Sequence, residues 1–331
     1  MMKAGARNTI ADVSSIRVGH ATDEAAKSGV SVIWPVHPAT AAVHVAGGAP
    51  GTRETDLLAP ENTVERVHAL ALSGGSAFGL AAADGVMAAL AEAGEGFAVG
   101  PHHIPIVPSA ILFDLMAGGN DSRPDYRALG RQALRQASTD IRLGSLGAGT
   151  GAMTATVRGG IGSASSVLDG IGTIGALVAV NALGNPLIGS TRHFWAAPFE
   201  QRGELGYLGW PALMPEDAMT LRLKHRPVLP NTNTTIAVIA TDAALTKAQC
   251  KRLAMAAHDG FTRALWPAHL PMDGDLVFAL STAEPGSTPV GIETMIDLCA
   301  SAASTMARAI ARGIYEAKPL PGDPKPAWRN L

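Results

Sequence analysis

The stretch PNTNTTIAVIATD, residues 230–242, decides how the fold of this chain is interpreted. Its second part, TIAVIAT at 235–241, is a short apolar run bounded by polar residues and predicts a buried strand. A few residues further on, Thr246 and Gln249 have the spacing of a capping box, in which two side chains satisfy backbone amides at a helix start. A helix is therefore predicted to begin soon after the strand.

The rest of the chain alternates predicted strands and helices. LVFALST at 276–282 predicts a second strand, and a last helix follows with one apolar face over 292–310. Helical spacing of apolar residues predicts one helix core at 64–71 and another at 80–90. Further buried strands are predicted from the runs SVIW at 31–34, AAVHV at 41–45 and GALVAV at 175–180. The pattern indicates an α/β protein built in layers, and no internal repeat divides it.

Composition excludes several classes of function. Of the 331 residues, 47% are hydrophobic and only 16% are charged, against about 25% charged in typical soluble domains. Little charge indicates much covered surface, so we expect a homo-oligomer. The net charge of -2 and the lack of Lys/Arg runs argue against nucleic-acid or membrane binding. Neither a signal peptide nor a membrane-spanning stretch is present, so we expect a cytoplasmic protein.

One long segment, 184–233, has no sustained period. It mixes Pro, Gly, charged residues and scattered aromatics, which is typical of a long surface loop or linker. Such loops are usually functional or mobile.

Metal and nucleotide sites have little support. The ten histidines are dispersed and neither CxxC nor HExxH occurs, so no metal or other cofactor is expected. The glycine-rich stretches 147–151 and 159–162 lack the complete motif of a phosphate-binding loop. They are more often tight turns and points of close backbone approach, although exposed amides there could serve an oxyanion or a substrate carbonyl.

The polar cluster NTNTT, directly before the predicted strand at 235–241, suits self-cleavage. A threonine hydroxyl at the strand edge can attack the preceding carbonyl and form an ester that water resolves. The new terminal amine, with an ordinary pKa of about 7.7 to 8.0, can then act as the base for the same hydroxyl. Alone, such a cluster is more often simply a polar entry to a strand.

Asp273 and Asp275 support the chemical interpretation. They stand two residues apart at the start of the next predicted strand, 39 residues after Thr234, so extended backbone would direct both carboxylates to one face. A carboxylate pair can orient a terminal amine and tune its proton affinity. The alternative is an ordinary Asp-Gly turn.

Long blocks of this chain resemble the L-aminopeptidase/D-esterase (DmpA-type) family. The blocks cover nearly the whole sequence, in order: GGAPGTRETDLL (47–58), HALALSGGSAFGLAAADGV (68–86), GAGTGAMTATVRGGIGSAS (147–165), ALVAVNALGN (176–185), NTTIAVIATDAALT (233–246) and MDGDLVFALST (272–282). The resemblance implies an αββα sandwich related to ornithine acetyltransferase, as a single domain over 1–331. It also implies self-cleavage into an α chain, 1–233, and a β chain, 234–331, and assembly as a homotetramer.

The same resemblance implies roles for individual residues. The NTT and DGD pairing is most similar to nylon-oligomer (6-aminohexanoate oligomer) hydrolases, which implies a cut between Asn233 and Thr234 with Thr234 as nucleophile. Neighbouring Thr235 would face the opposite side of the strand. Asn181 matches the family's oxyanion-stabilising amide. Asp273 and Asp275 match its acidic pair.

Two positions depart from the nylon-oligomer hydrolases. Arg158 stands where those enzymes have a catalytic-site lysine, and an arginine keeps the charge but does not give up its proton. Phe113 replaces a substrate-contacting tyrosine, which makes the expected substrate pocket more apolar.

The expected activity is hydrolysis of an amide or ester in short peptides, amino-acid amides or ω-amino-acid oligomers, through an acyl-enzyme on Thr234. Two alternatives remain open at this point. The same acyl-enzyme could pass its acyl group to an amine, as an acyltransferase does. The chain could also be a structural or binding homologue that never matures.

Overall fold

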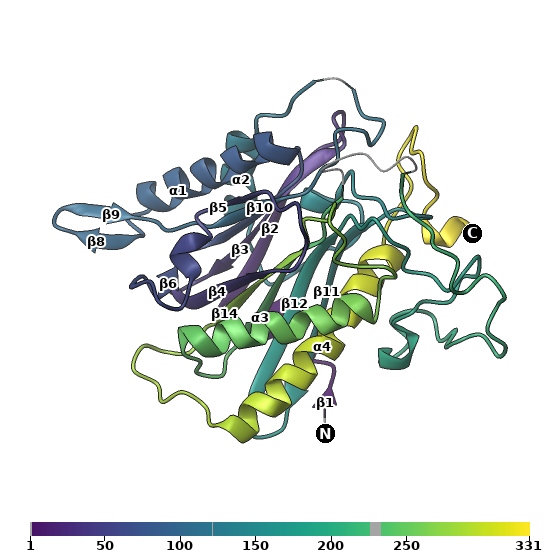
Figure 1. Cartoon of the computed structure of the whole chain (residues 1–331). Helices are drawn as coiled ribbons and strands as arrows, with labels where there is room; N and C mark the ends of the chain where they lie inside the picture. The colour runs from purple at the N-terminus through teal and green to yellow at the C-terminus, as the bar shows by residue number, and fades with distance from the viewer. Residues whose placement is uncertain (1, 121, 226–232) are drawn as a thin grey trace.

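The computed structural model describes residues 2–120, 122–225 and 233–331 (Figure 1). Its larger sheet has seven strands in the order β1-β11-β12-β13-β14-β4-β6, and its second sheet has five in the order β2-β3-β7-β10-β5. The larger sheet comprises β1 (Met2–Lys3), β4 (Ala39–Val45), β6 (Arg66–Val67), β11 (Gly160–Leu168), β12 (Gly172–Val180), β13 (Ile236–Thr241) and β14 (Leu276–Ser281). The second comprises β2 (Ile16–Asp23), β3 (Ser28–Pro35), β5 (Thr52–Arg53), β7 (Leu70–Ser73) and β10 (Ser109–Ile111).

Helices cover the outer face of each sheet (Figure 1). Helices α1 (Ala82–Glu92) and α2 (Tyr126–Arg135) pack on the five-stranded sheet. On the larger sheet, α3 (Lys247–Thr262) and α4 (Ile292–Tyr315) form the opposite outer layer. A small hairpin of β8 (Phe97–Val99) and β9 (His102–Ile104) projects beyond α1.

Between the two sheets lies an apolar core contributed by both inner faces. Leu72 and Ile33 of the smaller sheet and Leu177, Val238 and Phe278 of the larger one are all fully buried in it. Because helices cover the outer faces as well, the central strands are apolar on both sides and appear in sequence as unbroken apolar runs. The predicted αββα sandwich is confirmed.

Close packing of α4 on the sheet depends on glycine at one position. A Cβ atom built on Gly162 of β11 would lie 1.9 Å from the carbonyl oxygen of Ala309 in α4. Only a residue without a side chain allows the helix backbone so near the strand. The stretch 159–162 is therefore a place of close backbone approach.

Two strands that were predicted after the irregular segment set the geometry of the site. β13 and β14 pair in parallel, with Ile236 opposite Leu276, and α3 provides the crossover between them. The parallel register extends beyond the strands to a bridge between Asn233 and Asp273. A constant register places Thr234 beside Gly274 at this end of the sheet.

The capping box predicted at the start of α3 is confirmed. The amide of Gln249 donates to Thr246 Oγ1 at 3.1 Å, and the amide of Thr246 donates to Gln249 Oε1 at 2.9 Å. By contrast, the helix predicted over 64–71 is wrong, because that stretch forms β6 and the first half of β7. Residues 67–73 are buried throughout, so helical spacing of their apolar members carries no information about a single exposed face.

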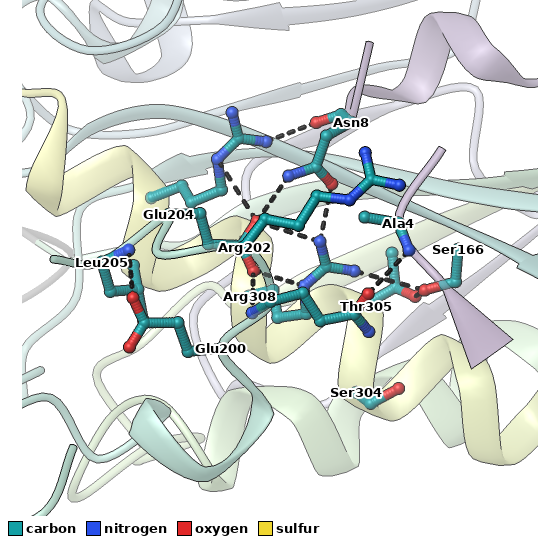
Figure 2. Close-up of polar contacts among 12 residues, drawn as sticks. Ala4, Asn8, Ser166, Glu200, Arg202, Glu204, Leu205, Ser304, Thr305 and Arg308 are labelled. Atoms are coloured by element: carbon teal, nitrogen blue, oxygen red, sulfur yellow. Dashed lines mark hydrogen bonds and ion pairs between the residues drawn. The ribbon is translucent and has the colours of Figure 1, made fainter. Parts of the chain in front are cut away.

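The described part of the irregular segment, 184–225, contains one short 3-10 helix, Ala197–Phe199. Ionic contacts between the buried Glu204 and α4 hold it against the body (Figure 2). Arg308 of α4 donates to Glu204 through Nε at 2.5 Å and Nη2 at 2.9 Å, and its Nη2 also donates to Asn8 Oδ1 at 2.6 Å. The segment is thus tied to both ends of the chain, whereas residues 226–232 lie outside the described residues.

Within the described ranges, no helix combines the length and apolar composition needed to cross a membrane.

Candidate active site

Thr234 lies at the entrance to β13 with its hydroxyl directed back at the preceding peptide bond. Its Oγ1 donates to the carbonyl oxygen of Asn233 at 2.5 Å. The backbone amide of Gly274 donates to the same oxygen at 3.0 Å. Both Asn233 and Thr234 are buried, the latter with 3% of its surface exposed. The Asn233–Thr234 bond is therefore held between a hydroxyl and a backbone donor, away from bulk solvent.

The space for the Thr234 side chain exists because residue 274 is glycine. A Cβ atom at position 274 would lie 2.6 Å from Thr234 Oγ1 and 2.8 Å from the carbonyl oxygen of Ala49. Neither atom could keep its place beside such a methyl group, since real contacts are about 3.5 to 4.0 Å. The glycine of the DGD motif is thus part of the site, a role that the sequence argument assigned only to the flanking aspartates.

Asn181 follows β12 directly and lies against Thr234. Its carbonyl oxygen accepts the Thr234 amide at 3.0 Å. Its side-chain Oδ1 accepts the Met153 amide at 3.0 Å, and Nδ2 donates to the carbonyl oxygen of Phe113 at 3.0 Å. The structure therefore brings Asn181 to the Asn233–Thr234 bond and fixes its carboxamide from both ends.

Asp273 is buried beside the same bond but contacts backbone amides and not the threonine hydroxyl. Leu183 N donates to its Oδ1 at 3.3 Å and Leu270 N to its Oδ2 at 2.9 Å. Burial, together with the negative charge of Asp275, raises the pKa of Asp273 to about 7. The carboxyl can therefore exchange a proton near neutral pH.

Asp275 binds Thr235, the residue after Thr234. Its Oδ1 accepts the Thr235 amide at 2.8 Å, and its Oδ2 accepts the His269 amide at 3.1 Å and faces His269 Nδ1 at 3.0 Å. Although burial lowers the pKa of His269, its hydrogen bond and attraction to Asp275 outweigh that effect and raise it. Asp275 thus fixes the start of β13, with a histidine as its ionic partner.

Arg158 is placed away from this cluster. Its fully buried side chain forms an ion pair with Asp323 and donates to the carbonyl oxygen of Thr150. The C-terminal segment covers it, since the Arg158 amide donates to Pro326 O at 2.9 Å. None of these contacts, in the part of the chain that the structure describes, joins Arg158 to Thr234 or Asn181.

A lysine that sequence reasoning missed occupies the site instead. Lys224 Nζ donates to Asn181 Oδ1 at 2.6 Å. Burial lowers the pKa of Lys224 to about 7, against the opposing attraction of Asp273 and Asp114. Lys224 is the only lysine in the irregular stretch 184–233, but that stretch has no period from which the direction of its side chain could be predicted.

A cavity of about 310 Å³ opens beside Lys224. Phe113, the predicted substrate-binding residue, lines it together with Asp114, whose pKa burial raises to about 6. The remaining lining residues are Met116, Ala117, Gly151, Met153, His225, Pro324 and Lys325. Its walls are thus mostly apolar, with a few charged groups, as in sites that bind small organic molecules.

The glycine-rich stretch 147–151 is a packed turn. The Gly147 amide donates to Thr22 Oγ1 at 2.8 Å, and the Ala148 amide donates to Ser31 Oγ at 3.0 Å. These two amides are therefore already engaged within the protein. Among the described residues, no group of three or more His, Cys, Asp or Glu side chains is arranged to hold a metal ion.

Known structures define the class of this fold. The chain aligns with a Burkholderia sp. β-aminopeptidase at a TM-score of 0.73 and 24% identity, covering 99% of this chain and 92% of that one. It also aligns with the L-aminopeptidase D-Ala-esterase/amidase of Ochrobactrum anthropi at a TM-score of 0.70 and 23% identity, covering 97% and 89%. The fold is that of the DmpA-type N-terminal-nucleophile hydrolases.

The chain belongs to peptidase family S58, whose family model matches residues 8–326. It is 43% identical over 337 residues to an uncharacterized aminopeptidase of Mycobacterium bovis, covering 96% of each chain. It is 30% identical over 288 residues to a 6-aminohexanoate-oligomer endohydrolase of Kocuria sp., covering 84% of this chain and 77% of that one. The predicted family is confirmed, and the protein is a hydrolase of the aminopeptidase/amidase type.

Proposed function

We propose that the chain cuts its own backbone between Asn233 and Thr234, and that the freed Thr234 then hydrolyses amide bonds as an N-terminal nucleophile. The observation that carries this proposal is the 2.5 Å hydrogen bond from Thr234 Oγ1 to the Asn233 carbonyl oxygen. The same oxygen accepts a second hydrogen bond from the Gly274 amide. Nucleophile and electrophile are adjacent in the uncut chain, so the attack needs no large movement.

The self-cleavage follows from these contacts. Thr234 Oγ attacks the Asn233 carbonyl carbon, and the negative charge that develops on the oxygen is stabilised by the Gly274 amide. The carbon–nitrogen bond breaks and the hydroxyl proton ends on the departing nitrogen, which leaves an ester. Water then hydrolyses that ester, releasing the Asn233 carboxylate and a free Thr234 with its hydroxyl restored.

In the mature site, one residue supplies both nucleophile and base. The terminal amine of Thr234 takes the proton of its own hydroxyl, which attacks the substrate carbonyl and forms an acyl-enzyme. The backbone carbonyl oxygen of Asn181 already accepts a hydrogen bond from the Thr234 nitrogen, and its side-chain Nδ2 donates to the oxyanion. The Thr234 ammonium group gives this proton to the leaving nitrogen of the substrate, which departs as an amine. Water then hydrolyses the acyl-enzyme, releasing the acid and free Thr234.

The proposed substrates are short peptides, amino-acid amides and ω-amino-acid oligomers. The cavity lined by Phe113 and Met153 has the size and mostly apolar walls for one short acyl group, and Asp114 and Lys224 provide polar contacts. Relatives named as aminopeptidases and as 6-aminohexanoate-oligomer endohydrolases support this range.

We also propose that the protein works as a homo-oligomer, with a tetramer as the expected form. Large apolar side chains on the irregular segment face solvent in the single chain, including Tyr207 at 77% and Leu213 at 86% exposed. Protein contacts commonly cover exposed apolar side chains that gather on one surface, and those of this segment are the candidates for such a contact. Light scattering on the purified protein gives the subunit number directly.

The test of the central proposal is intact-mass spectrometry of wild type, Thr234→Ser and Thr234→Ala. Wild type and the serine variant should split into fragments of about 24 and 10 kDa, since 233 and 98 residues share a chain of 33.9 kDa. Thr234→Ala should stay whole. A wild type that remains intact on ageing, or an alanine variant that is cut at the same bond, refutes the proposal.

A further inference from the structure

Lys224 reaches the active site from the irregular segment, on the N-terminal side of the proposed cut. Its backbone amide donates to Leu183 O at 2.8 Å, which fixes this part of the segment beside the chain leaving β12. Its side chain then extends to Asn181, where Nζ lies 2.6 Å from Oδ1. The contact is short enough to be a strong, charge-assisted hydrogen bond when the amine is protonated.

The orientation of the Asn181 carboxamide depends on this contact. Oδ1 accepts hydrogen bonds from the Met153 amide and the Lys224 amine, while Nδ2 donates one hydrogen bond to Phe113 O. A flipped carboxamide would set its NH₂ group against two other donors, so the flip is strongly disfavoured. Among the described residues, Phe113 O is the one acceptor that Nδ2 contacts, so its second hydrogen is the donor that we assign to a substrate oxyanion.

The ammonium group that binds Asn181 Oδ1 also changes how strongly the free Nδ2–H group donates. Hydrogen bonds in series polarise one another, so an ammonium group bound to Oδ1 draws electron density from the carboxamide and makes the remaining N–H a better donor. Because an oxyanion is more negative than a substrate carbonyl, the gain is larger in the transition state than in the ground state. The effect should therefore appear in kcat and not in KM.

We propose that Lys224 is a positioning residue of the active site, whose ammonium group orients and polarises the Asn181 carboxamide for oxyanion stabilisation. The inference rests on the proposed function, because it assigns the lysine to the same hydrolytic site. It also means that the cut must leave Lys224 bound, so that the N-terminal product contributes this residue to the nucleophile on the C-terminal product.

The charges around Lys224 determine the pH range in which it acts. Asp273 and Asp114 favour the ammonium form, whereas burial and Lys325 disfavour it, with the net result that the pKa of Lys224 falls to about 7. His225 also borders the cavity. The active ammonium form is lost as pH rises through that value, while the Thr234 amine, the base, becomes available as pH rises toward about 8. The two requirements predict a bell-shaped pH profile of kcat.

The experiment measures p-nitroaniline release from an amino-acid p-nitroanilide by wild type, Lys224→Met, Lys224→Arg and the control Lys318→Met, after intact mass confirms the cut. Lys224→Met should lower kcat by about 10- to 100-fold, less than the loss of a whole oxyanion donor, with KM changed less than about twofold. Lys224→Arg should retain most of the rate but lose the alkaline limb, because arginine keeps its proton. Lys318→Met removes an exposed lysine that does not line the cavity, and should keep that limb.

Two results overturn the inference alone: a cut and active Lys224→Met enzyme with the wild-type kcat, or a Lys224→Arg enzyme that keeps the alkaline limb. If Lys224→Met does not fold, the pH profile of Lys224→Arg decides. A wild type that stays uncut or releases no p-nitroaniline refutes the proposed function, and the role of Lys224 with it. The two failures are thus distinguishable.

Discussion

Replacing Gly274 by alanine should slow self-cleavage by about 100-fold while leaving the fold in place. The added methyl carbon would lie 2.6 Å from Thr234 Oγ1 and 2.8 Å from Ala49 O, whereas unstrained contacts are about 3.5 to 4.0 Å. The carbonyl belongs to the backbone and cannot rotate away, so the Thr234 side chain must shift by about 1 Å. A misplacement of that size costs about 100-fold in rate, and overpacking costs about 1 to 3 kcal/mol of stability.

The assay is a time course of intact mass, with thermal unfolding measured on the same samples. Gly291→Ala is the matched control, because a Cβ atom there meets no heavy atom within 4 Å and its φ of -75° suits alanine. The control should be cut at the wild-type rate. A Gly274→Ala chain that is folded and cut as fast as wild type would show that the close approach of Gly274 to Thr234 is not needed, and would refute this reasoning.

Three further predictions concern the site and its support. Asn181→Ala should lower kcat by about 100- to 1000-fold with a folded protein, as for loss of one oxyanion donor, and wild-type kcat would contradict its role. Arg308→Met should reduce the free energy of unfolding in urea by about 3 kcal/mol, because it removes the nearest ion partner of the buried Glu204 carboxylate and leaves Arg312 Nε at 3.7 Å, and Arg308→Met/Glu204→Met should recover part of the loss. His269→Gln should lower stability in a pH-dependent way, because folding raises the pKa of His269 through its pairing with Asp275. The stabilisation from this pair is complete below the pKa of the unfolded histidine, about 6.5, and is lost as pH rises through the pKa of the folded one. Urea titrations of wild type and variant should therefore converge at alkaline pH, and a constant gap would exclude the ion pair as the cause.

Several parts of the fold could be predicted from local sequence. Apolar runs that are buried on both faces, such as 235–241 and 276–282, correspond to β13 and β14, and the Thr246–Gln249 pair marks the start of α3. These signals are local because strand propensity and helix capping depend on neighbouring residues. The helix predicted at 64–71 was wrong because residues 67–71 are all buried, and a buried segment has no exposed face whose period distinguishes helix from strand.

The sequence by itself predicted a layered α/β protein with a candidate threonine and a pair of aspartates, and the resemblance of its blocks to the DmpA-type family implied the αββα class and added Asn181. The tertiary structure alone decided that Gly274 makes room for the Thr234 hydroxyl, and that Lys224 reaches Asn181 while Arg158 pairs with Asp323. These contacts join residues on different elements and on an irregular segment. Their distances follow from strand register and side-chain packing in three dimensions, which no periodicity along the chain encodes.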